Sequence, residues 1–330
     1  MKQFSALIAI LFLSLSTAAQ DIEALKANII YLSSDELGGR GPGSEGARKA
    51  ADYIAEQFKK VGLKPFRGDS YFQPFDMPNQ DVPERNVIGY IPAKEKTDRS
   101  IVFTAHYDGY GIVESVEGDD KIHNAAQDNA AGVAGMIEMA RIYSQKKSPT
   151  QNLVFIATAA EEGGARTPRA EMTGADFYAL NPLFPLSGIT INLNIDGFNN
   201  LGPAADYWVM PRQGVDFVDE LRAALKPFPM NYAPPDWIDG MNKSFDTQAF
   251  LSRGVPAVTI WTGFELREGA GGKVPRFGRI HAPDDEYNDT WRFDAAEEFL
   301  RMYEAVADRY LESGKRGKVT DLSLFKEEAK

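Results

Sequence analysis

The sequence SIVFTAHYDG, residues 100–109, begins as a short apolar run and ends in polar side chains. Its apolar part, Ile101–Ala105, is typical of a strand that is buried on both faces of a sheet. His106 and Asp108 follow directly at the carboxyl end of this strand. Similar apolar runs predict four further strands: Asn86–Ile91, Leu153–Ala157, Ile189–Ile195 and Val255–Trp261.

Segments with helical periodicity alternate with these strands. Apolar residues recur at helical spacing in Asp21–Leu32, between the N-cap Ser44 and Gly62, in Val133–Tyr143 and in Phe293–Leu311. This alternation predicts a single three-layer α/β/α domain, with a central mixed, mostly parallel sheet flanked by helices. Two Pro-rich pieces, Pro203–Pro211 and Pro227–Met241, are predicted to be irregular loops that surround a site.

Composition excludes several classes of protein. The 330 residues are 43% hydrophobic, which is enough for a large core and excludes a disordered chain. The net charge of −11 argues against binding to nucleic acid, because such a surface repels phosphate. No Cys is present, so disulfides, thiolate metal sites, a Cys nucleophile and an acylated lipoprotein Cys are all excluded.

The first 19 residues have the pattern of a cleavable signal peptide. Lys2 precedes an apolar run from Phe4 to Leu15, and small residues follow at 17–19. This run is too short to span a membrane, and no later segment reaches the roughly 18 apolar residues required. We therefore expect a secreted or periplasmic protein with one domain over residues 20–313 and a loose, charged C-terminal tail over 314–330.

Histidines and carboxylates gather where the predicted strands and one helix begin or end. They are His106, Asp108, Asp128, Glu161, Glu162, Asp196 and His281. Taken singly, such residues are more often helix caps or ordinary surface and core side chains. Ligand-binding groups of open α/β sheets collect at the carboxyl ends of strands, however, and imidazoles with carboxylates suit zinc. Together, these residues predict a metal site.

Five motifs in chain order resemble those of the M28 family of zinc metallopeptidases, in its cocatalytic aminopeptidase group. They are HYDG at 106–109, NAAQDNAAG at 124–132, AEEG at 160–163, NIDG at 194–197 and HAPDD at 281–285. The stretch YLSSDELGGRGPGS, residues 31–44, is similar to the N-terminal stretch of that family. The resemblance covers residues 28–311.

The resemblance implies two zinc ions per chain and assigns five ligands to them. One zinc would be bound by His106 and Asp196, and the other by Glu162 and His281. Asp128 would bind both ions. His123 lies just before the second motif and is expected not to be a ligand, because five ligands are already assigned.

The resemblance also implies two catalytic residues that bind no metal. Glu161 would act as the general base, and Asp108 would accept the second ring N–H of His106 and fix its tautomer. The predicted protein is a di-zinc exopeptidase, an aminopeptidase that hydrolyses N-terminal residues from peptides. Its partner would be a peptide substrate.

Three alternative functions stay open on the sequence. A carboxypeptidase or dipeptidase would need a cation for the terminal carboxylate, for which the candidates are Arg166, Arg169 and Arg212. A glutaminyl cyclase would use a single zinc. A binding protein built on an inactive peptidase fold would have broken ligand motifs, and none is broken.

Aromatic residues near the last motifs could line a pocket for the substrate or belong to the core. They are Tyr232, Trp237, Trp261 and Phe264. Neither the preferred substrate residue nor the oligomeric state follows from the sequence.

Overall fold

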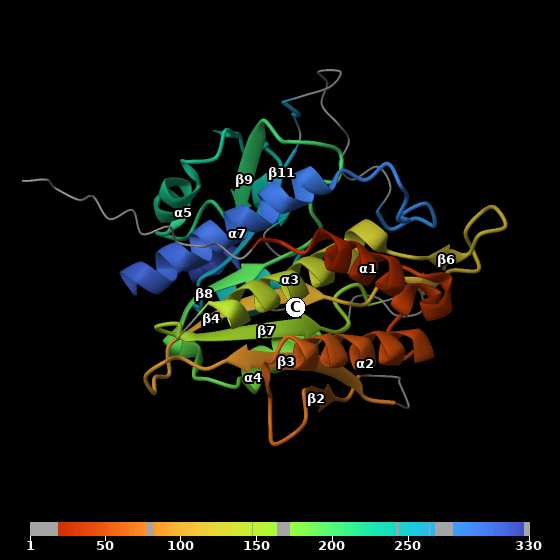
Figure 1. Cartoon of the computed structure of the whole chain (residues 1–330), viewed down its shortest axis with the longest axis horizontal. Coiled ribbons are helices and arrows are strands. Elements are labelled where there is room, and N and C mark those ends of the chain that lie inside the picture. Colours follow the sequence, from red (N-terminus) through yellow and green to blue (C-terminus); the bar gives the residue numbers. More distant parts are fainter. Residues whose placement is uncertain are drawn as a thin grey trace, which may run out of the picture.

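The computed structural model describes residues 19–77, 82–146, 148–163, 172–241, 244–263, 265–267 and 280–326. Within them, the predicted strands belong to one sheet (Figure 1). Its strands are β1 (Lys64–Pro65), β2 (Phe72–Phe75), β3 (Glu84–Ile91), β4 (Ser100–His106), β7 (Asn152–Thr158), β8 (Ile189–Asn194), β9 (Asp206–Met210), β10 (Asn231–Tyr232) and β11 (Ala257–Thr262). Two short strands, β5 (Gly111–Ile112) and β6 (Ile122–His123), form a separate antiparallel pair.

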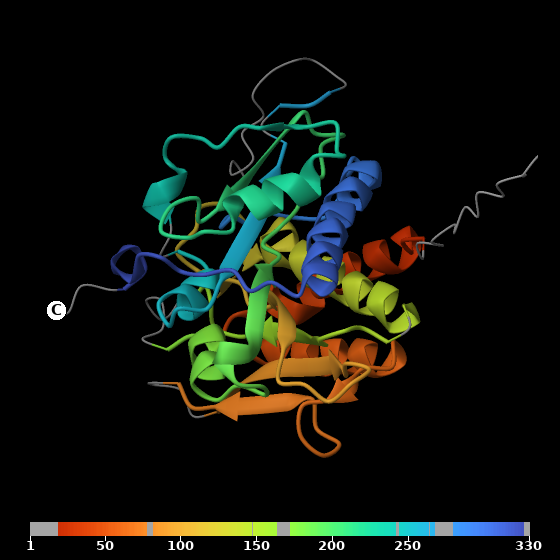
Figure 2. The ribbon, with the colours of Figure 1, turned by 90° about the vertical axis from the view of Figure 1, so that its left-hand side faces the viewer.

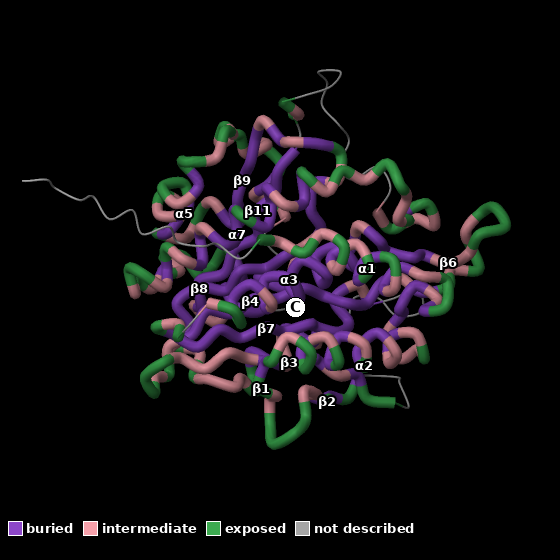
Figure 3. Tube along the Cα trace, in the orientation of Figure 1, coloured by how far each residue is buried: buried purple, intermediate pink, exposed green. Residues whose placement is uncertain are grey.

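The strand order is β1-β3-β7-β4-β8-β11-β9-β10, with β2 paired to β3 at one edge. The neighbours β7, β4, β8 and β11 run parallel, and antiparallel pairs flank this centre. Every residue of β4, β7 and β8 is buried, as Figure 3 shows for the middle of the molecule. The predicted mixed, mostly parallel sheet is confirmed.

Helices cover both faces of the sheet. The α-helices are α1 (Ile22–Leu32), α2 (Glu45–Lys60), α3 (Ala131–Gln145), α4 (Gly174–Leu180), α5 (Val218–Leu225), α6 (Thr247–Leu251) and α7 (Phe293–Ser313). Side chains of α1, α2, α3, α5 and α7 belong to one apolar core, and those of α4 and α6 to a second. No helix in the described part of the chain is long and apolar enough to cross a membrane.

Local sequence explains where α1 and α2 begin. The side chain of Asp21 accepts a hydrogen bond from the N–H of Ala24 at the start of α1, and Ser44 caps α2 through Ala47. The predicted helices therefore form within one or two residues of their expected bounds.

One Pro-rich piece was wrongly predicted to be irregular. Residues 206–210 form β9, which is buried and pairs antiparallel with β11. Pro203 and Pro211 only flank this strand, and its five residues include the apolar Trp208, Val209 and Met210. Flanking prolines mark the ends of a short strand as readily as they mark a loop.

The C-terminal tail is packed against the domain rather than loose, at least over residues 314–326. Figure 2 shows this dark blue segment running from the end of α7 across the molecule. Val319 pairs with Val215, Arg316 donates to the carbonyl of Ile189, and Phe325 is fully buried in the second core. The tail was predicted to be loose because most of it is charged. A few apolar side chains nevertheless pack against the domain.

Candidate metal centre

The predicted ligands converge at one edge of the sheet. His106 is the last residue of β4, Glu162 follows β7 and Asp196 follows β8. Because these three strands run parallel, their carboxyl ends meet at the same edge. Asp128 comes from the irregular turn Ala126–Ala130 just before α3, and His281 comes from the segment that leads to α7.

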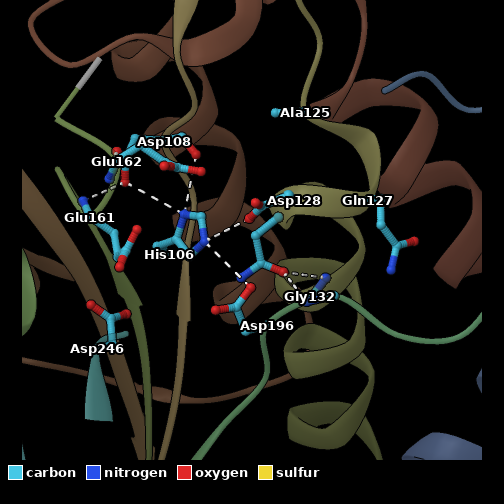
Figure 4. Close-up of polar contacts among 12 residues, drawn as sticks. His106, Asp108, Ala125, Gln127, Asp128, Gly132, Glu161, Glu162, Asp196 and Asp246 are labelled. Carbon is cyan, nitrogen blue, oxygen red and sulfur yellow. Dashed lines mark hydrogen bonds and ion pairs between the residues drawn. The ribbon is translucent and has the colours of Figure 1, made fainter. Parts of the chain in front are cut away.

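Asp128 lies between the two histidines. Its Oδ1 is 3.1 Å from His106 Nε2, and its Oδ2 is 3.0 Å from His281 Nε2. Asp196 Oδ1 lies 3.8 Å from His106 Nε2, whereas Glu162 Oε1 lies 3.0 Å from His281 Nε2. The close-up in Figure 4 shows His106, Asp128 and Asp196 pointing toward one another. The side chains therefore form two groups that share one carboxylate.

The donor set fits zinc. His106, Asp128 and Asp196 offer three ligand atoms within 4.8 Å of one another, and so do Asp128, Glu162 and His281. Neutral imidazole nitrogens and carboxylate oxygens are the ligands that zinc takes when no thiolate is present. Each group could hold one ion, with Asp128 contributing an oxygen to both.

Glu161 lies beside these groups, and its neighbour Glu162 is the proposed ligand. It is buried, and it forms a further close cluster with His106 and Glu162. The N–H groups of Glu161 and Glu162 both donate to the carboxylate of Asp108, at 3.0 Å each. Asp108 thus fixes the main chain that carries both glutamates.

This arrangement differs from the predicted contact between Asp108 and His106. The Asp108 carboxylate is 3.8 Å from His106 Nδ1, which is too long for a hydrogen bond. The main-chain oxygen of Asp108 lies closer, at 3.3 Å from the same nitrogen. The two backbone N–H groups after β7 turn the carboxylate away from the imidazole.

The carboxylates shift the pKa values of both histidines upward in the metal-free protein. Hydrogen bonds to Asp128 and Glu162 raise the pKa of His281 to about 10. Burial disfavours the charged form of His106, but the hydrogen bond to Asp128 and the nearby carboxylate of Asp196 outweigh it and raise that pKa well above its usual value. The pKa of His281 therefore lies above neutral pH when no metal is bound.

Metal binding is consequently expected to release protons. A histidine ligand must be neutral, so zinc has to displace the proton that His281 holds below about pH 10. Zinc affinity should then rise about tenfold per pH unit for each proton released, from pH 6 to pH 8. Calorimetric titration of the metal-free protein in buffers of different ionisation enthalpy measures the number of protons released when zinc binds. We expect at least one proton per chain.

His123 provides the control for this measurement. It is a buried histidine outside both ligand groups, and burial lowers its pKa. The variant His123→Gln should release as many protons as the unchanged protein. A zinc affinity that is independent of pH between 6 and 8 would contradict the assignment of the histidines.

The predicted ligands line a cavity of about 280 Å³. Its other lining residues include the apolar side chains Met241, Phe245, Trp261 and Ile280. The Trp261 indole N–H donates to the main-chain oxygen of Asp196 at 3.0 Å, and the Phe245 ring packs edge-on against it. This wall is therefore fixed relative to the ligands.

Three buried polar residues that support the site were not singled out from the sequence. Asp285 Oδ1 accepts the N–H of Gln127, and its Oδ2 accepts the N–H of Asp128. Asn129 donates to the main-chain oxygen of Ile195 and accepts the N–H of Gly197, one residue on either side of Asp196. The third, Asp246, is described next.

Asp246 directly precedes α6. Its carboxylate lies close enough to His106 and Asp196 for their charges to affect its pKa. It is buried, its Oδ2 accepts a 2.5 Å hydrogen bond from Thr158, and burial raises its pKa to about 6. Asn129 and Asp285 belong to quoted motifs. The sequence does not indicate which residues Asp246 contacts.

Several other predicted candidates lie away from the ligands. Arg212 forms a 2.8 Å ion pair with Asp239. Trp237 is 44% exposed and is not among the residues that line the cavity. Arg166, Arg169 and Phe264 lie outside the described residues, as does the predicted signal peptide up to residue 18.

Known proteins share this sequence pattern and this fold. The family model "Peptidase family M28" matches residues 86–305. YfbL, an uncharacterized protein of Escherichia coli, is 25% identical over 264 residues, which cover 72% of this chain and 76% of YfbL.

Two solved structures illustrate the likeness in fold. A Zn-dependent exopeptidase from Parabacteroides distasonis aligns with a TM-score of 0.63 and 19% identity, over 90% of this chain and 99% of that one. A glutaminyl cyclase from Tannerella forsythia also aligns with a TM-score of 0.63, at 16% identity, over 88% of this chain and 98% of that one. The α/β/α architecture is therefore shared by enzymes of different activity.

Proposed function

The chain belongs to peptidase family M28 and is a zinc metallopeptidase, and from this premise we propose that it is a di-zinc aminopeptidase that acts on peptides. The observation that carries the proposal is the position of Asp128, whose two oxygens face two different histidines. A carboxylate so placed could contribute one oxygen to each of two ions. His106 and Asp196 would hold one zinc, Glu162 and His281 the other, and Asp128 both.

Zinc supplies Lewis-acid chemistry when it is bound, since it polarises a carbonyl and lowers the pKa of water. The protein supplies the proton transfers. Glu161 adjoins the proposed ligand Glu162 and is itself assigned to neither ion, so its carboxylate would take a proton from the attacking water. The same carboxyl group then returns this proton to the leaving amine.

The cavity wall selects the substrate. Met241, Phe245, Trp261 and Ile280 present apolar surface beside the ligands, and an apolar first side chain would be desolvated there. We therefore propose a preference for peptides that begin with an apolar residue. We also propose that residues 1–19 direct export, so that the enzyme acts outside the cytoplasm.

Analysis of the products by mass spectrometry tests this function. The zinc-loaded protein is incubated with one peptide that begins with Leu, with its Asp-first counterpart and with its N-acetylated form, each with and without a chelator. We expect stepwise loss of residues from the free N-terminus, at least about tenfold faster for Leu than for Asp. Acetylation and the chelator should each abolish this loss.

Other products would point to the alternative functions. Loss of residues from the C-terminus would contradict the aminopeptidase and indicate a carboxypeptidase. A peptide that begins with Gln should be included because glutaminyl cyclases share this fold. Ring closure of that Gln without cleavage would establish the cyclase instead.

A further inference from the structure

Arg40 lies within the N-terminal motif 31–44 and has a fully buried side chain. It lies at the end of a tight turn over residues 35–40, with a left-handed backbone at φ 52°. Gly39 precedes it at φ 67°, and a Cβ there would lie 2.4 Å from the main-chain oxygen of His123. This glycine lets the turn pass against the β5–β6 pair and directs Arg40 into the protein.

The Arg40 guanidinium donates hydrogen bonds to four main-chain carbonyls. Nε donates to Tyr107 at 2.6 Å, Nη2 to Ala125 at 2.9 Å, and Nη1 to Asn124 at 2.8 Å and also to Leu32. A single planar group therefore joins the end of α1, the segment after β4 and the segment before α3. No carboxylate is among these four acceptors.

The carbonyls that Arg40 joins belong to the segments that carry two metal ligands. Tyr107 directly follows His106, and Ala125 precedes Asp128 by three residues. The guanidinium is rigid, so its two edges fix the spacing between these segments. His106 and Asp128 belong to the same ligand group, and that spacing sets the distance between their ligand atoms.

The buried charge is tolerated because of the acidic centre. Burial lowers the pKa of Arg40 to about 10, while the charges of Asp108, Asp285 and Asp128 favour its protonated form. The side chain is therefore a cation at neutral pH. A lysine at this position would keep the positive charge. Its single ammonium group could not donate to all the carbonyls that the planar guanidinium reaches along its two edges.

We propose that Arg40 is a positioning residue for the metal site formed by His106, Asp128 and Asp196, an inference that rests on the proposed two-zinc function. It holds the segments of His106 and Asp128 at the separation that one zinc requires. Groups that orient metal ligands in this way typically change metal affinity by about 10- to 100-fold when they are replaced.

The variant Arg40→Lys tests the proposal through metal binding rather than activity. Zinc titration against a competing chelator resolves two binding steps, and thermal unfolding of the chelated protein reports on the fold. We expect the step of the His106, Asp128 and Asp196 group to weaken by about 10- to 100-fold, and the step of the Asp128, Glu162 and His281 group, which contains only one of the two residues that Arg40 positions, to weaken by a smaller factor. Arg316→Lys is the matched control, because Arg316 also donates to two main-chain carbonyls, that of Ile189 at the amino end of β8 and that of Gly254 before β11. Both zinc affinities should be unchanged in that variant.

A second variant decides the question if Arg40→Lys does not fold. Asn124 donates to the main-chain oxygen of Ser33 and to Asp35 Oδ1, and so ties the same segment to the same turn without a buried charge. Asn124→Ala should weaken the same zinc step by a smaller factor. Wild-type affinity for both ions in the folded variants, with only a lower unfolding temperature, would overturn the proposal. A wild-type protein that binds fewer than two zinc ions would instead overturn the two-zinc site itself.

Discussion

Replacing Glu161 with glutamine is expected to lower kcat by about 10³-fold or more and to leave both zinc ions bound. The amide has the shape of the carboxylate but cannot accept the proton of the attacking water. The main chain at Glu161 is held by Asp108 through its N–H, so the substitution should not displace the neighbouring ligand. Peptide hydrolysis gives kcat, and the zinc content of the dialysed protein gives the metal stoichiometry.

The adjacent residue provides the control for this experiment. Glu162→Gln makes the same chemical change one position along the chain, at a side chain whose Oε1 lies 3.0 Å from His281 Nε2. This variant should lose zinc, whereas Glu161→Gln should not. If the two variants lost the same amount of metal, or if Glu161→Gln kept its activity, Glu161 would not be the general base.

The five ligands were assigned from short motifs that resemble those of the M28 family, and their role as ligands stays a prediction. His106 and Asp196 follow strands whose apolar runs are evident, and the parallel order of β4 and β8 brings their ends together. The structure places all five predicted ligands in two groups. The distances between neighbouring ligands could not be predicted, since they depend on loops that are far apart in the chain.

The residues that support the ligands were harder to predict. Arg40 and Asp285 lie within quoted motifs, yet their partners are main-chain groups. Three of the four carbonyls that Arg40 binds, and both N–H groups that Asp285 binds, are more than 60 residues away. A main-chain partner cannot be identified from the sequence, because every residue except Pro offers the same N–H and C=O groups. The same limit explains β9 and the tail, since their burial depends on what the rest of the chain places against them.

These supporting contacts explain how a metal centre can be built on loops. Asp128 stands in an irregular turn, and its position is set from two sides. Arg40 binds the carbonyls at the start of this segment, and Asp285 binds the N–H groups of Gln127 and Asp128. Asn129 then fixes the main chain around Asp196, and its Oδ1 also accepts the N–H of Gly132. The ligand carboxylates are thus oriented before any metal arrives.

Asp128→Ala is expected to have the largest effect on metal binding, because this carboxylate is shared by both ligand groups. Each group keeps only two ligands without it, so zinc content should fall from two ions to less than one per chain. Stability should fall at the same time, since bound zinc stabilises the folded state by an amount that grows with its affinity. Zinc analysis and thermal unfolding with and without added zinc measure the two effects.

Comparison with Asp196→Ala tests whether Asp128 serves both ions or only one. Asp196 belongs to one group only, so its variant should keep the zinc bound by Glu162 and His281. We therefore expect about one ion per chain in Asp196→Ala and less in Asp128→Ala. In both variants the added zinc should raise the unfolding temperature less than in the wild type, and least in Asp128→Ala. Two zinc ions retained in Asp128→Ala, or equal losses in the two variants, would show that this carboxylate does not bridge the ions.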